Sequence, residues 1–394
     1  MQIVVTCPFG LSVLCQRELR SLWYLATRQW SKLILQWTWS DVYRINLHSR
    51  IANKVYVTLA SGKIYDFDAL FAVVSAVDRQ QYIASWHGIR VLARSYDSKL
   101  ASIRTIQSIV HKSILTQLTG SRDTQWEVDD DKTVIEVSVD IYKDMVMVMI
   151  NTSGASLHER WYRTEQWEAP LKENIAAGLL MFAGWDGSSP LFDPFCGSGT
   201  ICIEAAMIAA SIAPGIARKF AFEEFGYFDG LVYDWLRQSA ESCKLQAASN
   251  TTQIKIFGSD IDPDVLAKAK ANADRAGVGA MIQFEEKHFL DVEFRLQISD
   301  SRLQNTESCL QIDPGLPRHF IPRNDEKVLC VTNPPYGVRL GQESEELVED
   351  LVSAFARYSL SGGFLLLRGL QAPWFSHIDL LNGQQEVCFY AKQQ

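Results

Sequence analysis

The stretch Asp193-Pro-Phe-Cys-Gly-Ser-Gly-Thr200 links a short apolar segment to a helical pattern, and it decides the expected fold. Gly197 and Gly199 let the backbone of this turn approach a ligand closely, because neither residue carries a Cβ atom. The first amide groups of the following helix are unpaired and carry a partial positive charge. The turn therefore predicts a binding site for an anionic group where a strand passes into a helix.

The spacing of the two glycines narrows the choice of ligand. The motif lacks the third glycine of a dinucleotide fingerprint and the Gly-Lys-Ser/Thr of a phosphate-binding loop. A carboxylate such as that of a methionine moiety suits the helix start, and Asp193 can help to hold the ammonium of the same moiety. The candidate cofactor-binding residues of the turn are Asp193, Gly197, Ser198, Gly199 and Thr200. A tight turn without a ligand is the alternative for this motif taken alone.

The chain around this turn alternates strand and helix patterns from Pro190 onward, which indicates a parallel, doubly wound sheet. Strands are expected at 191–193, 254–260, 281–285, 328–333 and 363–367. Helices are expected at 171–183, 200–212, 265–276 and 347–358. Residues 213–250 must form an extra segment, and 299–325 is expected to be a surface insertion.

A second motif, Gly258-Ser-Asp260-Ile-Asp262-Pro263, ends the next main strand. A carboxylate at this place in a doubly wound sheet can accept hydrogen bonds from both hydroxyl groups of a ribose. Asp260 is the candidate for that role. Asp262 precedes a proline at a helix start, so we expect it to be the N-cap of the next helix.

The most specific motif is Asn333-Pro-Pro-Tyr336-Gly337, which follows the apolar strand expected at 328–333. Two prolines fix the exit of a strand and leave carbonyl groups without ladder partners. The Asn333 side-chain oxygen and the Pro334 carbonyl can accept both hydrogens of an exocyclic amine on a base, and Tyr336 can stack on that base. Methyl transfer to the amine would then depend on positioning and electrostatics, without a metal or a strong general base.

The first 170 residues read as a mixed α/β region without a catalytic motif. Strands are expected at 2–7, 33–39, 41–47, 89–93, 133–140 and 145–151. Helices are expected at 11–22, 67–77 and 100–118, and residues 50–59 are also regular. The aromatic and charged stretch 158–170 is expected to be a linker.

Composition limits the class of protein. Of 394 residues, 47% are hydrophobic and 21% are charged, as in ordinary globular proteins, and no apolar run approaches the ~20 residues of a membrane helix. The eight cysteines contain no Cys-x-x-Cys pair, so we expect buried, reduced thiols in a cytoplasmic protein and no metal site. Residues 1–170 hold 19 Lys and Arg against 17 Asp and Glu, whereas the remainder holds 19 against 29. With a net charge of −8, any basic surface is expected in the first part.

With these motifs in view, nearly the whole chain resembles the bacterial THUMP-domain methyltransferases of the 23S ribosomal RNA guanine-N2 group, and the N-terminal half of the fused RlmKL type. The resemblance rests on the glycine-rich motif, on the Asn-Pro-Pro-Tyr motif and on six further stretches. These are Thr6-Cys-Pro-Phe-Gly-Leu11, Asn151–His158, Arg160-Trp-Tyr-Arg163, Ala169-Pro-Leu-Lys-Glu173, Ile212-Ala-Pro-Gly215 and Asn382-Gly383. It implies S-adenosylmethionine as cofactor and RNA as partner, with Arg160 and Arg163 as candidates for contact with RNA phosphate; ordinary surface charge is an equally good account of these two arginines.

The resemblance also implies a domain order. A ferredoxin-like part is expected at 1–55, a THUMP RNA-binding domain at 56–155, a linker at 156–170 and a Rossmann-like class I methyltransferase domain at 171–394. The family usually has an acidic residue near the cofactor's adenine. His288 stands at that position here, and Asp291 is the nearest acidic candidate.

Three functions remain open at this point. The first is formation of N2-methylguanosine in ribosomal RNA. The second keeps the chemistry but moves it to transfer RNA or to adenine N6, because the exocyclic amines of the bases share that chemistry. The third is a non-catalytic RNA-binding factor in ribosome assembly. The sequence favours the first and leaves the oligomeric state undetermined.

Overall fold

The computed structural model describes residues 2–29, 32–36, 38–77, 82–83, 87–119, 134–163, 171–250, 256–289, 328–334, 349–353, 361–367, 376–382 and 385–392. The chain forms two compact units. The first comprises Met1–Arg160 and Ala213–Cys243, and the second comprises Trp161–Ile212 and Lys244–Gln394. The range 171–394, expected as one domain, thus loses residues 213–243 to the first unit. The other predicted domain boundaries stay predictions.

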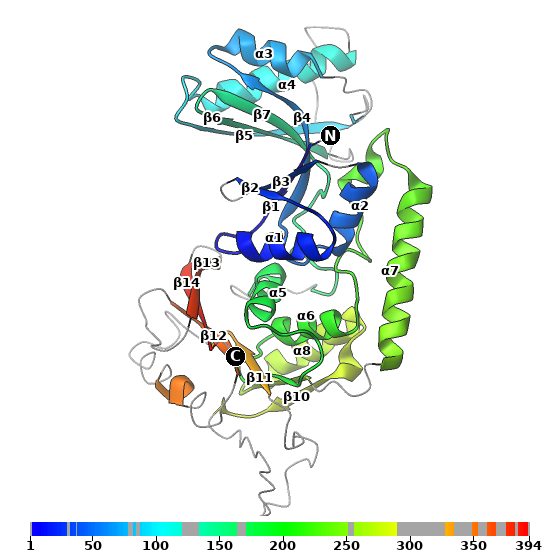
Figure 1. Cartoon of the computed structure of the whole chain (residues 1–394), viewed down its shortest axis with the longest axis vertical. Helices are drawn as coiled ribbons and strands as arrows, with labels where there is room; N and C mark the ends of the chain where they lie inside the picture. The colour runs from blue at the N-terminus through cyan, green and yellow to red at the C-terminus, as the bar shows by residue number, and fades with distance from the viewer. Residues whose placement is uncertain are drawn as a thin grey trace, which may run out of the picture. The chain divides into compact units, whose positions relative to one another are not determined.

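The first unit is built on one seven-stranded sheet in the order β2-β3-β1-β4-β7-β6-β5 (Figure 1). Its strands are β1 (Gln2–Thr6), β2 (Thr27–Gln29), β3 (Lys32–Gln36), β4 (Lys54–Lys63), β5 (Gly88–Tyr96), β6 (Val134–Tyr142) and β7 (Met145–Asn151). The first four strands, with α1 (Ser12–Ser21) and α2 (Trp39–His48), give the β-α-β-β-α-β order of a ferredoxin-like fold. β4 also pairs with β7, so the sheet continues into the segment that carries α3 (Phe67–Ser75) and α4 (Ile103–Thr119).

One predicted element of this unit is wrong. Residues 41–47 were expected to be a strand, but they lie inside α2. A capping box starts the helix, because the side chains of Thr38 and Asp41 satisfy each other's backbone amides. Val42, Ile45 and Asn46 are then buried on one face at helical spacing.

The segment 213–243 packs against the ferredoxin-like part through a close approach at Gly215. The Gly215 amide donates to the Leu47 carbonyl at 2.9 Å. A Cβ atom on Gly215 would lie 2.7 Å from the Phe220 ring and 2.8 Å from the Asn46 carbonyl oxygen. Beyond it lie a short 3-10 turn (Ala221–Glu224) and α7 (Gly230–Asn250). Rings of the segment pack on Tyr43 of α2, with Phe222 at a centroid distance of 4.7 Å.

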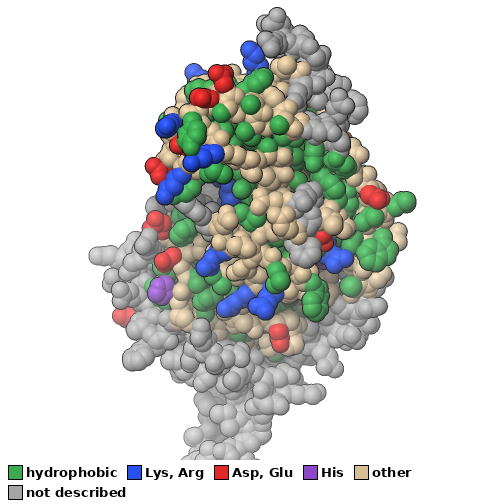
Figure 2. Space-filling view, turned by 45° about the horizontal axis from the view of Figure 1, so that its top comes forward, with side chains coloured by type: hydrophobic (Ala, Val, Ile, Leu, Met, Phe, Trp, Pro, Cys, Tyr) green, Lys and Arg blue, Asp and Glu red, His purple; other side chains and the backbone are tan. Residues whose placement is uncertain are grey.

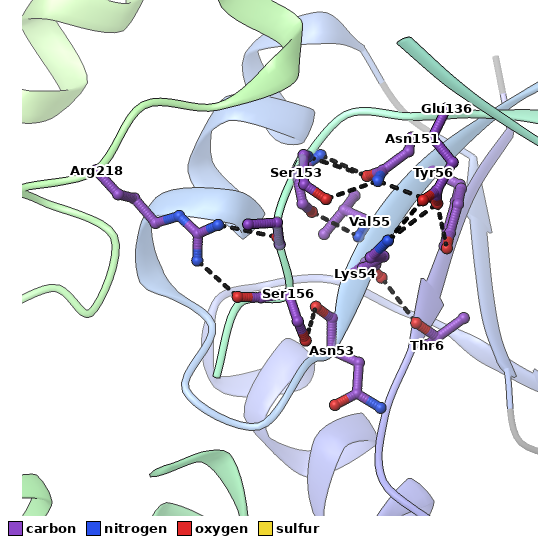
Figure 3. Close-up of polar contacts among 12 residues, drawn as sticks. Thr6, Asn53, Lys54, Val55, Tyr56, Glu136, Asn151, Ser153, Ser156 and Arg218 are labelled. Carbon is purple, nitrogen blue, oxygen red and sulfur yellow. Dashed lines mark hydrogen bonds and ion pairs between the residues drawn. The ribbon is translucent and has the colours of Figure 1, made fainter. Parts of the chain in front are cut away.

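A polar contact fixes the same segment to the end of the chain's first part (Figure 3). The Arg218 guanidinium donates to the carbonyls of Ala155 and Ser156, each at 2.9 Å. The Phe222 amide donates to the Thr152 carbonyl at 3.1 Å. Residues 213–243 therefore complete the fold of the first unit, although they lie between two strands of the second unit in the sequence.

The second unit contains a seven-stranded sheet in the order β10-β9-β8-β11-β12-β14-β13. Its strands are β8 (Leu191–Asp193), β9 (Ile256–Asp260), β10 (Ile282–Glu286), β11 (Leu329–Thr332), β12 (Ser361–Leu367), β13 (Ser376–Asn382) and β14 (Gln385–Lys392). Its helices include α5 (Glu173–Phe182), α6 (Thr200–Ala209) and α8 (Pro263–Ala276). The strands from β10 to β12 are parallel, as expected for a Rossmann-like sheet. Of the helix expected at 347–358, residues 349–353 are described and are helical.

The far end of this sheet differs from the expected parallel arrangement. β14 lies between β12 and β13 and is antiparallel to both. Only two residues separate β13 from β14, whereas a parallel pair needs a crossover of about a dozen residues. The short connection therefore forces an antiparallel hairpin at this edge.

Among the described residues, no helix is both long and apolar enough to cross a membrane. In the face drawn in Figure 2, Lys and Arg side chains lie in several small groups between hydrophobic and polar ones. Of the seven cysteines in the described part of the chain, Cys243 is exposed and the others are buried. The expectation that all thiols are buried is therefore wrong at Cys243.

Candidate active site

The carboxyl ends of three adjacent parallel strands carry the predicted site residues. Asp260 ends β9, Asp193 ends β8, and Asn333 follows β11 directly. The sheet order β9-β8-β11 makes these strands neighbours. β9 and β10 follow β8 on one side, whereas β11 and β12 are added on its other side, so the strand order reverses between β8 and β11. Ligands of open α/β sheets bind in the crevice outside such a switch point. The fold therefore brings the three motifs to one edge of the sheet.

The glycine-rich turn has the backbone conformation that the two glycines allow. Gly197 has φ of 51° and Gly199 has φ of 83°, both in the left-handed region. Gly199 is the N-cap of α6, and a Cβ atom there would lie 3.1 Å from the Cβ of Ala269 on α8. A Cβ atom on Gly197 would meet nothing within 4 Å. Gly199 thus permits close packing of α6, whereas Gly197 presents open backbone that a ligand can approach.

Asp193 is a buried carboxyl group at the base of this turn. It is 1% exposed, and its Oδ1 accepts from the Thr332 hydroxyl at 2.6 Å and from the Phe195 amide at 3.2 Å. Burial raises the pKa of Asp193 from 3.8 to about 7, the two hydrogen bonds oppose that rise, and the charge of Asp260 adds to it. The carboxyl group is therefore poised to change charge near neutral pH.

Asp260 ties β9 to the glycine-rich turn. Its Oδ2 accepts from the Gly197 amide at 3.0 Å, and its Oδ1 accepts from the Asp262 amide at 3.1 Å. Each carboxylate oxygen keeps a second acceptor position for a ligand hydroxyl. Asp262 caps α8 by accepting from the amides of Asp264 and Val265, with Pro263 in the first helical turn, so the predicted N-cap is confirmed.

The side chain of Asn333 carries a buried polar atom at the carboxyl end of β11. Within the described part of the chain, its side-chain oxygen is buried and has no hydrogen-bond partner. Burying a polar atom without a partner costs about 1–3 kcal/mol, so such atoms in native proteins call for a ligand or a water. The neighbouring Pro334 is buried. The predicted site residues Tyr336 and Asp291 lie outside the described residues.

The two arginines with a predicted RNA contact have other partners in the structure. Arg160 is 4% exposed, and its guanidinium donates to the carbonyls of Leu157 and Arg50. Arg163 pairs with buried Glu173 at 3.1 Å and donates to the Thr200 hydroxyl. These contacts favour a structural role for both side chains over contact with RNA phosphate. The contact with Arg163 also occupies the hydroxyl of Thr200, a predicted cofactor residue.

Three residues important to the site geometry were missed from the sequence. Thr332 holds Asp193, and its place directly before Asn333 is the one local signal that could have found it. A Cβ atom on Gly258 would lie 2.9 Å from the Phe284 ring and 3.0 Å from the Cβ of Cys196. Asn272 on α8 donates to the Ser198 carbonyl at 3.1 Å, across 74 residues of sequence. No local pattern predicts the last contact.

Comparison with known proteins agrees with this fold. Residues 160–303 match the family model described as the RMKL-like methyltransferase domain, and residues 2–56 match that of the RlmL ferredoxin-like domain. The chain is similar over its whole length to the structure of SMU.472, a putative methyltransferase complexed with SAH, with a TM-score of 0.80 and 27% identity over 98% of that chain. The fold and site thus define an S-adenosylmethionine-dependent methyltransferase of class I.

Relatives with similar sequences identify the family within this class of methyltransferases. The chain is 31% identical over 357 residues to the putative RNA methyltransferase YpsC of Bacillus subtilis (strain 168), which covers 90% of this chain and 84% of that protein. It belongs to the RMKL-like methyltransferase family. The chain is also 31% identical to the ribosomal RNA large subunit methyltransferase K/L of Shewanella sp. (strain W3-18-1), but it spans only 39% of that protein's length. A structure titled as a predicted N6-adenine-specific DNA methylase, from Listeria monocytogenes str. 4b F2365, is 29% identical with a TM-score of 0.78 and coverage of 100% of this chain and 96% of that one.

The residues present fit S-adenosylmethionine. Gly197 offers open backbone beside the N-terminus of α6, and Asp260 retains acceptor positions at the end of β9. When bound, the cofactor supplies a methyl group activated by a sulfonium charge. The chain's own part would be to orient the methyl acceptor, and Asn333 and Pro334 are the predicted residues for that role. Membership of a methyltransferase family, with these residues in place, sets aside the non-catalytic alternative.

Proposed function

We propose that this chain methylates RNA, and that the product is N2-methylguanosine in the 23S ribosomal RNA. The observation that carries the proposal is the Asn333 side-chain oxygen, which is buried and without a partner at the carboxyl end of β11. The names of the Bacillus and Shewanella relatives support RNA as the substrate, and the Shewanella protein is named for large-subunit ribosomal RNA.

The chemistry of an exocyclic amine matches this pair of acceptors. The lone pair of guanine N2 is delocalised into the base, so the free amine is a poor nucleophile. The Asn333 oxygen accepts one amine hydrogen, and the Pro334 carbonyl accepts the other. Holding both hydrogens directs the lone pair toward the methyl group, and correct orientation supplies a large part of the rate enhancement.

The charges of the site support the same step. Asp193 ends β8, the strand beside β11, and Asp260 ends β9, on the other side of β8, so their carboxyl groups would favour binding of a positively charged sulfonium cofactor at these strand ends. The amine gains positive charge in the transition state, and two oxygen acceptors stabilise that charge without a covalent step. The base must leave its stack to reach acceptors at this depth.

The test is methyl transfer from labelled S-adenosylmethionine to total RNA from cells that lack the protein, followed by nucleoside identification. We expect labelled N2-methylguanosine in the 23S fraction and no label with Asn333→Ala. RNA from cells that contain the protein is the control, because its site is already modified. Label only in transfer RNA, or none in free RNA or in ribosomal particles, would contradict the proposal.

Adenine N6 is the second candidate acceptor, favoured by the name of the Listeria protein, a predicted N6-adenine-specific DNA methylase. It carries the same two amine hydrogens, so Asn333 and Pro334 fit it equally well. The same digestion distinguishes the two: N6-methyladenosine in place of N2-methylguanosine would keep the mechanism and replace the base. Transfer to double-stranded DNA in place of RNA would make the chain a DNA methylase, as the name of the Listeria protein says of that protein.

A further inference from the structure

The glycine-rich cofactor loop is held from outside by side chains that the methyl transfer itself does not require. The Asn272 amide nitrogen on α8 donates to the Ser198 carbonyl at 3.1 Å. Asn272 is 4% exposed, and its oxygen accepts from the guanidinium of Arg275, one turn further along the helix. The Nε of Arg275 donates to the Tyr162 carbonyl at 2.8 Å. A line of polar contacts therefore joins the middle of the loop to the segment just after Arg160.

A second line of contacts starts at the next residue of that segment. Arg163 donates to the hydroxyl of Thr200, the first residue of α6, and to the Leu171 carbonyl at 3.2 Å. Glu173 holds the same guanidinium as an ion pair of 3.1 Å, and both side chains are largely buried. The Tyr162 hydroxyl donates to buried Glu204 on α6 at 3.1 Å. Two consecutive residues, Tyr162 and Arg163, thus contact α6 directly, and Tyr162 is linked to the loop through Arg275 and Asn272.

The loop needs such support because of its composition. Gly197 and Gly199 both have positive φ, and glycine loses more conformational freedom on ordering than any other residue. Fixing the backbone of one residue costs about 1–2 kcal/mol. If the loop is already ordered before the ligand binds, this entropic cost does not reduce the binding affinity. Contacts at Ser198 and Thr200 hold the loop on either side of Gly199.

We propose that Asn272, Arg275, Tyr162 and Arg163 form a latch that holds the cofactor loop in its ligand-binding conformation. These are positioning residues, because the latch acts on the cofactor through the loop backbone. The segment 161–163 is then a part of the cofactor site and not only a linker. The proposal needs only cofactor binding, so it can fail or hold independently of the RNA substrate.

The test is the affinity for S-adenosylhomocysteine, measured by calorimetry on the full chain. Asn272→Asp keeps the shape and the partner of Arg275 but loses the donor to Ser198, and Asn272→Ala loses both. Loss of one such hydrogen bond should raise Kd by roughly 3- to 10-fold. Arg275→Ala should change Kd in the same direction, and Arg275→Lys should restore a part of the loss.

Kinetics separate a positioning role from a merely structural one. With the latch broken, KM for S-adenosylmethionine should rise while kcat at saturating cofactor stays near the wild-type value. Lys270→Ala, on an exposed position of the same helix, is the matched control and should leave Kd unchanged. Wild-type Kd in both Asn272 variants would overturn the proposal. A fall in kcat with unchanged KM would also overturn it, because that result would place the effect on the folded fraction or on the transfer step and not on cofactor binding.

Discussion

Asp193 and Asn333 show how single residues at strand ends set the chemistry of this site. Asp193 is a buried carboxyl group with a raised pKa, and Asn333 keeps a buried oxygen without a protein partner. Both features cost stability in the ligand-free protein, as is usual where polar groups are arranged for binding. Thr332 precedes Asn333, and its hydroxyl donates a hydrogen bond to Asp193. The end of β11 therefore fixes the position of Asp193 and also carries Asn333.

Asn333→Ala should reduce methyl transfer by about 100-fold or more, the usual effect of losing one positioned transition-state acceptor or donor. Affinity for S-adenosylhomocysteine should stay within a few-fold, because the proposed partner of this oxygen is the substrate amine and not the cofactor. Turnover assays and calorimetry on the same preparation check both statements. Near-normal turnover in this variant would remove Asn333 from the mechanism.

Whereas Asn333→Ala should mainly reduce methyl transfer, Asp260→Ala should mainly weaken cofactor binding. It should weaken cofactor binding by about 1–3 kcal/mol, the value of a lost charge-assisted hydrogen bond. The Gly197 amide also loses its acceptor, so part of this effect acts through the loop. Equilibrium binding of S-adenosylhomocysteine measures the change, and an unaltered Kd would mean that the ribose is held elsewhere.

Asp193 should make the stability of the ligand-free protein depend on pH. The folded protein keeps this proton up to about pH 7, whereas the unfolded chain releases it near 3.8. Between these values the folded state binds more protons, so this group's contribution to the free energy of unfolding falls as pH rises toward 7. Urea unfolding of wild type and Asp193→Asn at pH 5 and 8 isolates it. The wild type should lose more stability than the variant over this interval, and equal losses would contradict the raised pKa.

At the scale of elements, the docking of the 213–243 segment depends on backbone proximity. Gly215 approaches the end of α2 so closely that any side chain would overlap with Asn46, Leu47 and Phe220. The aromatic rings beyond it are packed against Tyr43, with Phe220 and Phe222 stacked at a centroid distance of 5.1 Å. The contact is therefore tightly fitted, and it should tolerate no added volume.

Gly215→Ala should destabilise the first unit by about 1–3 kcal/mol through overpacking. Gly230→Ala in the same segment is the control, because a Cβ atom there would meet only the Phe228 ring at 3.7 Å. Thermal unfolding should show a melting temperature several degrees lower for the first variant and little change for the second. Equal melting temperatures would mean that the segment shifts to make room.

At the scale of the whole molecule, the two units have separate sheets and separate cores. The cofactor residues Asp193, Gly197 and Asp260 all belong to the second unit. A ligand that binds only the folded form stabilises it by about 2.7 kcal/mol at 100 times its Kd. Only the unit that holds the site gains this stabilisation directly.

S-adenosylhomocysteine should therefore raise the melting temperature of the second unit by several degrees and leave that of the first nearly unchanged. Differential scanning calorimetry with and without the ligand resolves the two transitions, and Asp260→Ala should reduce the shift at the same ligand concentration. One transition that moves as a whole would show instead that the units unfold together.

The sequence by itself determined the local features of this protein. The glycine-rich turn, the acidic strand end, the N-cap at Asp262 and the Asn-Pro motif each consist of a few consecutive residues, so their places at strand ends and at a helix start could be predicted. Only the tertiary structure decided what depends on distant neighbours. In the structure, residues 41–47 are helical and residues 213–243 belong to the first unit. Arg160 and Arg163 have partners within the protein. The physical reason is that hydrophobic periodicity and motif spacing report a residue's immediate surroundings, whereas burial, pKa and pairing are set by side chains far away in the sequence.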